Sequence, residues 1–137
     1  MENTELFNVQ RMFRREWILF GLQAGTDQEA LAKMCRFACG QGMAKDTFPE
    51  AVREREKRYP TGISMPCLGI AIPHADACHV VKPGIVVAKL AQPVSFRGMG
   101  MEEAEVDVTY VFLLLMNHDN HQVFLLQNMM NLCMDQE

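Results

Sequence analysis

The 137-residue chain lacks several features that would assign it to common protein classes. Its net charge is -4, so there is no reason to expect the concentrated lysine and arginine of a nucleic-acid-binding surface. No apolar stretch reaches the length of a transmembrane helix, because the longest one, over residues 106–116, is interrupted by Asp107. The amino terminus also lacks the continuous apolar core of a signal peptide, so we expect a cytoplasmic protein.

Other absences concern the cysteines and the chain organisation. The five cysteines are odd in number and irregularly spaced, which fits a reducing compartment better than a disulfide framework. The chain has no internal repeat, low-complexity tract or linker, so we expect one domain over residues 1–137. Its last helix could be capped by Asn117 or Asp119. The helical pattern is still present at Glu137, so this helix is expected to be short or truncated.

Two capping boxes predict where the earlier helices begin. In Thr-Asp-Gln-Glu, residues 26–29, the threonine hydroxyl accepts from a backbone amide while the glutamate reaches back. This helix should extend to about Gly40 and be ended by Gly40 and Gly42. Thr-Phe-Pro-Glu, residues 47–50, repeats the pattern with a proline in the first turn, and predicts a helix to about Arg58.

Four segments are predicted strands: residues 17–23, 69–72, 85–90 and 106–115. The second of these belongs to the most informative stretch of the chain, Gly-Ile-Ala-Ile-Pro-His-Ala-Asp, residues 69–76. Pro73 cannot donate to a sheet ladder, so the strand must end there and the next side chain, His74, enters a rim or cleft. A lone histidine is more often structural than catalytic, although a neutral imidazole is nucleophilic near pH 7.

A longer segment around this histidine resembles the active-site signature of the fructose and mannitol class of enzyme IIA domains in the bacterial sugar phosphotransferase system. Arg55 and Glu56 match an Arg-Glu pair, residues 60–62 match a Pro-Thr-Gly turn, and residues 69–74 match a strand end that carries the histidine. The likeness covers nearly the whole chain. It continues through residues 83–96, where the family has a strand followed by a Pro-Val turn, through residues 106–115, and to His121.

The arginine of this pattern has two candidates. The stretch between Thr61 and Gly69 is a few residues longer than in the mannitol branch, which favours a galactitol-like or unassigned branch and leaves Arg53 as an alternative to Arg55. The mixed charges of residues 53–58 are typical of a solvated helix face. A single arginine from this run could still bind a phosphate, or Arg55 could pair with Glu56 or Glu105.

The resemblance implies an α/β fold with a mixed β-sheet flanked by helices on both faces. It implies that Nε2 of His74 accepts a phosphoryl group, and that His121 and Arg55 contact the phosphoryl oxygens. The implied partners are the phosphocarrier protein HPr, an enzyme IIB component and, indirectly, the membrane component enzyme IIC. Because the chain has no glycine-rich nucleotide loop or kinase motif, we expect a phosphoprotein donor rather than ATP, and no cofactor.

Three alternatives compete with this interpretation. A regulatory binding module of the same fold would use the same His74. His121 could lie inertly in the solvated first turn of a helix. A metal site could be assembled from histidines and cysteines. His74 and Cys78 are four residues apart, which suits one face of a helix, but Pro73 argues against a helix there. The residues considered for it are His74, Cys78, His79, His118 and His121.

Overall fold

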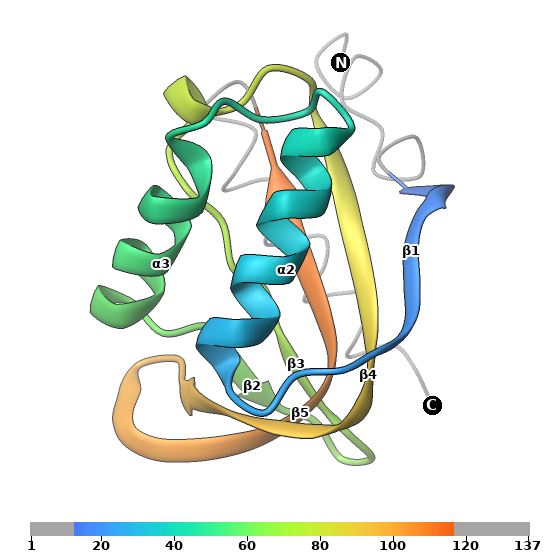
Figure 1. Cartoon of the computed structure of the whole chain (residues 1–137). Coiled ribbons are helices and arrows are strands. Elements are labelled where there is room, and N and C mark those ends of the chain that lie inside the picture. The colour runs from blue at the N-terminus through green and yellow to red at the C-terminus, as the bar shows by residue number, and fades with distance from the viewer. Residues whose placement is uncertain (1–12, 117–137) are drawn as a thin grey trace, which may run out of the picture.

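Two long strands form the centre of the fold. A computed structural model of the chain describes residues 13–116, and in it β4 (Gly84–Gly98) and β5 (Met101–Leu115) pair antiparallel over most of their length (Figure 1). Both strands are dense in β-branched and aromatic residues, which suit a pleated, half-buried surface. Gly100 adopts a φ of 72° between them, in the left-handed region that glycine enters without steric cost.

The remaining strands complete a mixed sheet. β1 (Phe13–Leu22) runs parallel to β4, and the short β3 (Gly69–Ala71) runs parallel to β5. β2 (Gly62–Ser64) pairs antiparallel with β3, and Gly62 pairs with Gly98 of β4. The five strands follow the order β1-β4-β2-β3-β5, with β4 and β5 also paired. Parallel and antiparallel pairs therefore coexist, as expected for the predicted α/β class.

Both α-helices of residues 13–116 lie on one face of this sheet, so the helix expected on the other face is not found among these residues. α2 (Asp27–Gly40) stands in front of the long strands in Figure 1, and α3 (Phe48–Arg58) stands to its left. Their apolar residues Leu31, Met34 and Phe48 are fully buried in the larger of two core clusters, together with side chains of β4 and β5. Neither helix is long and apolar enough to cross a membrane, a finding that covers residues 13–116.

The first predicted capping box is confirmed with one change. The Thr26 hydroxyl accepts a hydrogen bond from the Glu29 amide at 3.1 Å, as the pattern requires. The Glu29 carboxylate reaches one residue further back than expected, and accepts from the Gly25 amide at 2.9 Å. The helix ends where Gly42 adopts a φ of 77°, which is a conformation that favours glycine.

The second predicted capping box is wrong. Thr47 has helical backbone angles, φ -80° and ψ -9°, and its side chain makes no capping hydrogen bond. Its hydroxyl instead contacts Nδ1 of His79 at 2.7 Å. The helix still begins at Phe48, because Pro49 in the first turn has a preset φ and needs no amide partner there.

The strand predictions find the elements but not their bounds. The expected strands over residues 17–23, 85–90 and 106–115 all begin earlier in the structure, as β1, β4 and β5. β4 also continues through Pro93, so the turn expected around it is wrong. The pairing with β5 is irregular between Lys89 and Val94, and this irregularity accommodates a residue that cannot donate to the ladder. β2 was not predicted, because three residues carry too little pattern.

The opposite face of the sheet carries a second apolar cluster. It contains five buried residues from β3, β4 and β5 and the residues that follow them: Ile70, Ile72, Ile85, Leu114 and Met116. The helix predicted after Asn117 or Asp119 lies outside the described residues.

Candidate functional site

His74 lies at the end of β3, in a segment that β5 holds in place. β3 ends at Ala71, one residue earlier than predicted. The Leu114 amide of β5 donates to the Pro73 carbonyl at 3.0 Å, and His74 forms a parallel bridge with Leu114. Pro73 thus ends the strand because it has no amide hydrogen to donate, although its carbonyl still accepts a hydrogen bond from β5. The imidazole that follows is 6% exposed.

The hydrogen bond of the His74 ring determines which nitrogen is available. Nδ1 lies 3.0 Å from the Ile72 carbonyl oxygen, which can only accept, so Nδ1 carries the proton and Nε2 keeps its lone pair. Burial lowers the pKa of His74, and the nearby positive charge of Arg55 lowers it further, against the opposite effects of the Ile72 hydrogen bond and Asp76. The ring is therefore neutral near pH 7, as a nucleophile must be.

Arg55 extends from α3 toward the segment that carries His74. Its Nη1 lies 3.5 Å from Oδ1 of Asp76, and its guanidinium lies 5.5 Å from the centre of the Tyr59 ring. The Nε atom is buried, and no hydrogen-bond partner for it lies among residues 13–116. These groups line a groove of about 210 Å³ together with Ala75 and His79. A donor without a partner beside a neutral imidazole suits the binding of an anion.

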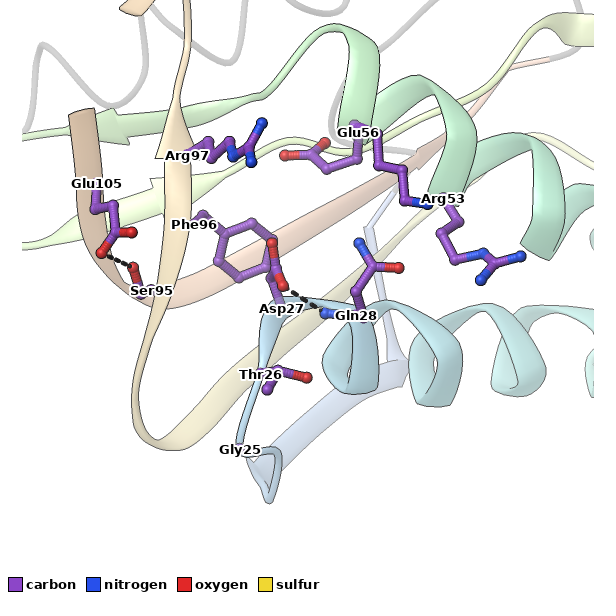
Figure 2. Close-up of a pocket in the computed structure, with 11 residues that line it drawn as sticks. Gly25, Thr26, Asp27, Gln28, Arg53, Glu56, Ser95, Phe96, Arg97 and Glu105 are labelled. Carbon is purple, nitrogen blue, oxygen red and sulfur yellow. Dashed lines mark hydrogen bonds between the residues drawn. The ribbon is translucent and has the colours of Figure 1, made fainter. Parts of the chain in front are cut away.

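Arg53 lies on the other side of α3. Its guanidinium pairs with the Glu50 carboxylate, and it lines a larger pocket of about 740 Å³ with Lys57 of α3 and Arg97 of β4 (Figure 2). Residues two positions apart point about 200° apart around a helix, so only one of these two arginines can face His74. Arg55, and not Arg53, lines the groove that Ala75 and Asp76 also line, and its charge acts on His74.

The ion pairs considered for Arg55 do not form. Glu56 is buried and accepts a hydrogen bond from the Thr61 amide, and Glu105 accepts a hydrogen bond from the Ser95 hydroxyl at 2.9 Å. Arg55 pairs with Asp76 instead, a residue that the sequence left without a role. Asp76 is exposed in this pair and Arg55 is half-buried, so water partly screens the attraction.

The burial of Glu56 is a feature that the sequence interpretation missed. The residue is 5% exposed, although the charged run around it is typical of a solvated helix face. Its carboxyl accepts from the Thr61 amide at 2.9 Å and from the Thr61 hydroxyl at 3.0 and 3.1 Å. A signal was present, because Phe48, Val52 and Glu56 recur every four residues and form the buried stripe of α3.

The residues of the alternative metal site are not brought together where the structure describes them. His79 contacts Thr47, and Cys78 is exposed. Over residues 13–116 no three histidine, cysteine or acidic side chains gather at one point. His118 and His121 lie outside the described residues.

Comparison with known proteins decides the family. Residues 11–137 match the family described as phosphoenolpyruvate-dependent sugar phosphotransferase system, EIIA 2. The chain belongs to this enzyme IIA family. It is 30% identical over 99 residues to the galactitol-specific EIIA component of Escherichia coli K12; the match covers 72% of this chain and 65% of that protein. The chain therefore matches slightly less than two thirds of the length of this relative.

Two similar solved structures are mannitol enzymes of Escherichia coli. The crystal structure of IIA mannitol has a TM-score of 0.71 at 24% identity, and the match covers 87% of this chain and 81% of that one. The complex of enzyme IIA mannitol with phosphorylated enzyme IIB mannitol has a TM-score of 0.68 at 25% identity and the same coverage. The enzyme IIA resemblance and the α/β fold class predicted from the sequence are thus confirmed.

Proposed function

We propose that this enzyme IIA chain is a phosphocarrier, in which Nε2 of His74 accepts a phosphoryl group from phospho-HPr and passes it to a cysteine of an enzyme IIB component. The sugar would be phosphorylated downstream, during uptake through the membrane component enzyme IIC. The observation that carries this proposal is the buried, neutral imidazole whose Nδ1 is committed to the Ile72 carbonyl. That arrangement leaves Nε2 as the nucleophile.

The proposed transfer balances without a cofactor. The Nε2 lone pair forms a bond to phosphorus as the bond between phosphorus and the donor nitrogen breaks, and the donor imidazole recovers its electron pair. In the second step a thiolate of enzyme IIB attacks the phosphorus, and His74 leaves as a neutral ring. The protein contributes position and charge, which are the main requirements of phosphoryl transfer.

Arg55 is proposed to bind the phosphoryl oxygens. Its Nε has no partner in the described residues and its Nη1 is held only at 3.5 Å by Asp76, so an arriving dianion offers a better acceptor. A guanidinium presents two parallel donors to such oxygens, which a lysine cannot do. His121 is proposed, from the sequence alone, as a second donor to the same oxygens.

Two comparisons support the assignment of the partners. The galactitol-specific relative is a component of a sugar phosphotransferase system. One structure similar to this chain is a complex of an enzyme IIA with a phosphorylated enzyme IIB. The shallow groove beside His74 fits a protein partner better than a small substrate, which would need an enclosing pocket.

The test is phosphorylation by HPr, enzyme I and phosphoenolpyruvate. The wild-type chain should acquire an acid-labile, base-stable label, because a phosphoramidate hydrolyses in acid. His74→Ala should abolish the label, whereas His79→Ala, which removes the histidine that lines the groove, should keep it. Labelling of His74→Ala at the wild-type level would refute His74 as the acceptor. A labelled protein that transfers nothing to enzyme IIB would favour the regulatory alternative.

A further inference from the structure

A continuous chain of hydrogen bonds joins Glu56 to His74. The Glu56 carboxyl accepts from both the amide and the hydroxyl of Thr61, and the Thr61 hydroxyl accepts from the Ile72 amide at 3.0 Å. The carbonyl of the same Ile72 accepts from Nδ1 of His74 at 3.0 Å. All four residues are buried, with exposed fractions between 1% and 6%. Buried hydrogen bonds of this kind are costly to leave unpaired.

Backbone groups determine the direction of three hydrogen bonds in this chain: Thr61 amide to Glu56, Ile72 amide to Thr61, and His74 Nδ1 to the Ile72 carbonyl. The two backbone amides can only donate, so the Thr61 oxygen must accept from Ile72, and a Glu56 oxygen must accept from Thr61. An ionised Glu56 carboxylate can only accept, so in that state the Thr61 hydroxyl proton points to it. A side chain at position 56 that could not accept would leave this proton without a partner, and the hydroxyl would be free to rotate away from Ile72.

Ile72 needs this support because of its place in the fold. β3 ends at Ala71, so the ladder offers the Ile72 amide no strand partner, and Pro73 follows without an amide of its own. The Thr61 hydroxyl acts in place of a neighbouring strand. Thr61 is itself the residue before β2, which pairs with β3 through Gly62 and Ala71. Both polar groups of Ile72 are thus committed, one to Thr61 and one to His74.

We propose that Glu56 and Thr61 are positioning residues for His74: the Glu56 carboxyl orients the Thr61 hydroxyl, which holds Ile72 so that its carbonyl keeps His74 in the Nδ1-protonated tautomer. Neither residue touches the phosphoryl group. The effect on transfer rests on the proposed function of His74, whereas the effect on the tautomer does not. Figure 2 shows the Glu56 side of this arrangement, where the carboxyl lies between α3 and Arg97.

The experiment compares variants of Thr61 and Glu56 in the full chain. Thr61→Val keeps the shape and removes the hydroxyl, Thr61→Ser keeps the hydroxyl, and Glu56→Gln keeps the volume but presents an NH₂ group to one side. Thr109→Val and Glu50→Gln are matched controls, because they make the same chemical changes on β5 and on the exposed side of α3. Circular dichroism verifies that each variant folds.

The first readout is the tautomer of His74, from the ¹⁵N shifts of its ring nitrogens in the unphosphorylated protein. The second is the rate of labelling by phospho-HPr. We expect Thr61→Val to mix the two tautomers and to slow labelling about tenfold, the usual effect of losing one positioning hydrogen bond. Thr61→Ser should restore both readouts. Glu56→Gln should shift both in the same direction by a smaller amount, and the controls should match the wild type.

A folded Thr61→Val variant with the wild-type tautomer and labelling rate would overturn the proposal. If Thr61→Val does not fold, Thr61→Ala decides, because it also removes the hydroxyl: a wild-type tautomer there would overturn the proposal, whereas a mixed tautomer supports it. The tautomer readout separates this inference from the proposed function. A wild-type chain that is never labelled on His74, but whose tautomer responds to Thr61→Val, would refute the phosphocarrier role and keep the positioning role.

Discussion

The two sides of α3 differ in a way that bears on where chemistry takes place. One side carries Arg53 and Lys57 and lines the pocket of about 740 Å³ that also includes the first residues of α2. The other side carries Arg55 and Tyr59 and lines a groove of about 210 Å³ next to the segment of His74. The larger pocket has more charged side chains, but the buried neutral imidazole lies beside the smaller groove.

Under the proposed function the site is the smaller groove, so pocket size would be a poor guide to it. A small-molecule site encloses its ligand, whereas an imidazole that exchanges phosphoryl groups with protein partners must be approachable by their surfaces. Glu56 lies between the two sides, since its carboxyl lines the larger pocket while its hydrogen bonds lead through Thr61 to His74. Four predictions test this comparison.

The largest effect is expected from Phe48, a buried residue of the core-facing stripe of α3. Phe48→Ala removes a fully buried aromatic ring and should lower the free energy of unfolding by about 3 to 5 kcal/mol. Tyr59→Ala, on the groove side and 60% exposed, should change it by less than about 0.5 kcal/mol. Urea denaturation of both variants measures the difference. Equal losses would show that the groove side of α3 is as well packed as its core side.

The second prediction concerns the two arginines. Arg55→Ala should slow labelling by phospho-HPr about a hundredfold, because one donor to transition-state oxygens typically contributes about 2.7 to 4 kcal/mol. Arg55→Lys should recover only part of this rate, because it restores the positive charge without the two parallel donors of the guanidinium. The fold should survive both changes, since the Asp76 end of the ion pair is exposed and the buried Nε has no partner among residues 13–116 to lose. Wild-type rates in both variants would remove Arg55 from the site.

The third prediction follows from the burial of Glu56, which raises the pKa of this carboxyl from 4.5 to about 7, although the hydrogen bonds from Thr61 act in the opposite direction. Between pH 4.5 and 7 the folded chain then binds more protons at this residue than the unfolded chain does. The contribution of Glu56 to stability therefore falls as the pH rises through this window. By pH 7.5 the free energy of unfolding of the wild type should have fallen by about 3 kcal/mol relative to that of Glu56→Gln.

Urea denaturation of the wild type and Glu56→Gln at several pH values tests this slope. Glu50→Gln is the control, because Glu50 is exposed on the same helix and its variant should show the wild-type pH profile. His74 has the opposite effect, since its pKa is lowered, so its contribution to stability rises with pH below 6.5. A constant difference between the wild type and Glu56→Gln across the window would contradict the raised pKa.

The smallest effect is expected on the side with the larger pocket. Arg53→Lys and Arg53→Ala disturb only an exposed pair with Glu50, and should change the free energy of unfolding by about 0 to 1 kcal/mol. The labelling rate should stay at the wild-type value in both. A transfer defect in Arg53→Lys, with Arg55→Lys silent, would reverse the assignment of the two sides.

The predictions that succeeded rest on short-range constraints. The start of α2 follows from Thr26 and Glu29, which interact with amides three to four residues away. The placement of His74 at a strand end follows from Pro73, its direct neighbour. The prediction of the second capping box was wrong because the Thr47 hydroxyl contacts His79, which lies 32 residues further along the chain. A pattern read along the chain does not include such a competitor.

The sequence by itself thus determined the family, the α/β class and the histidine that ends the strand, because proline and capping residues act on their immediate neighbours. Only the tertiary structure decided that Arg55 rather than Arg53 faces His74, and that Glu56 is buried within a charged run. Which side of α3 turns inward depends on contacts with strands tens of residues away. The hydrogen bonds from Glu56 to His74 exist because folding brings α3, the start of β2 and the end of β3 together at one point.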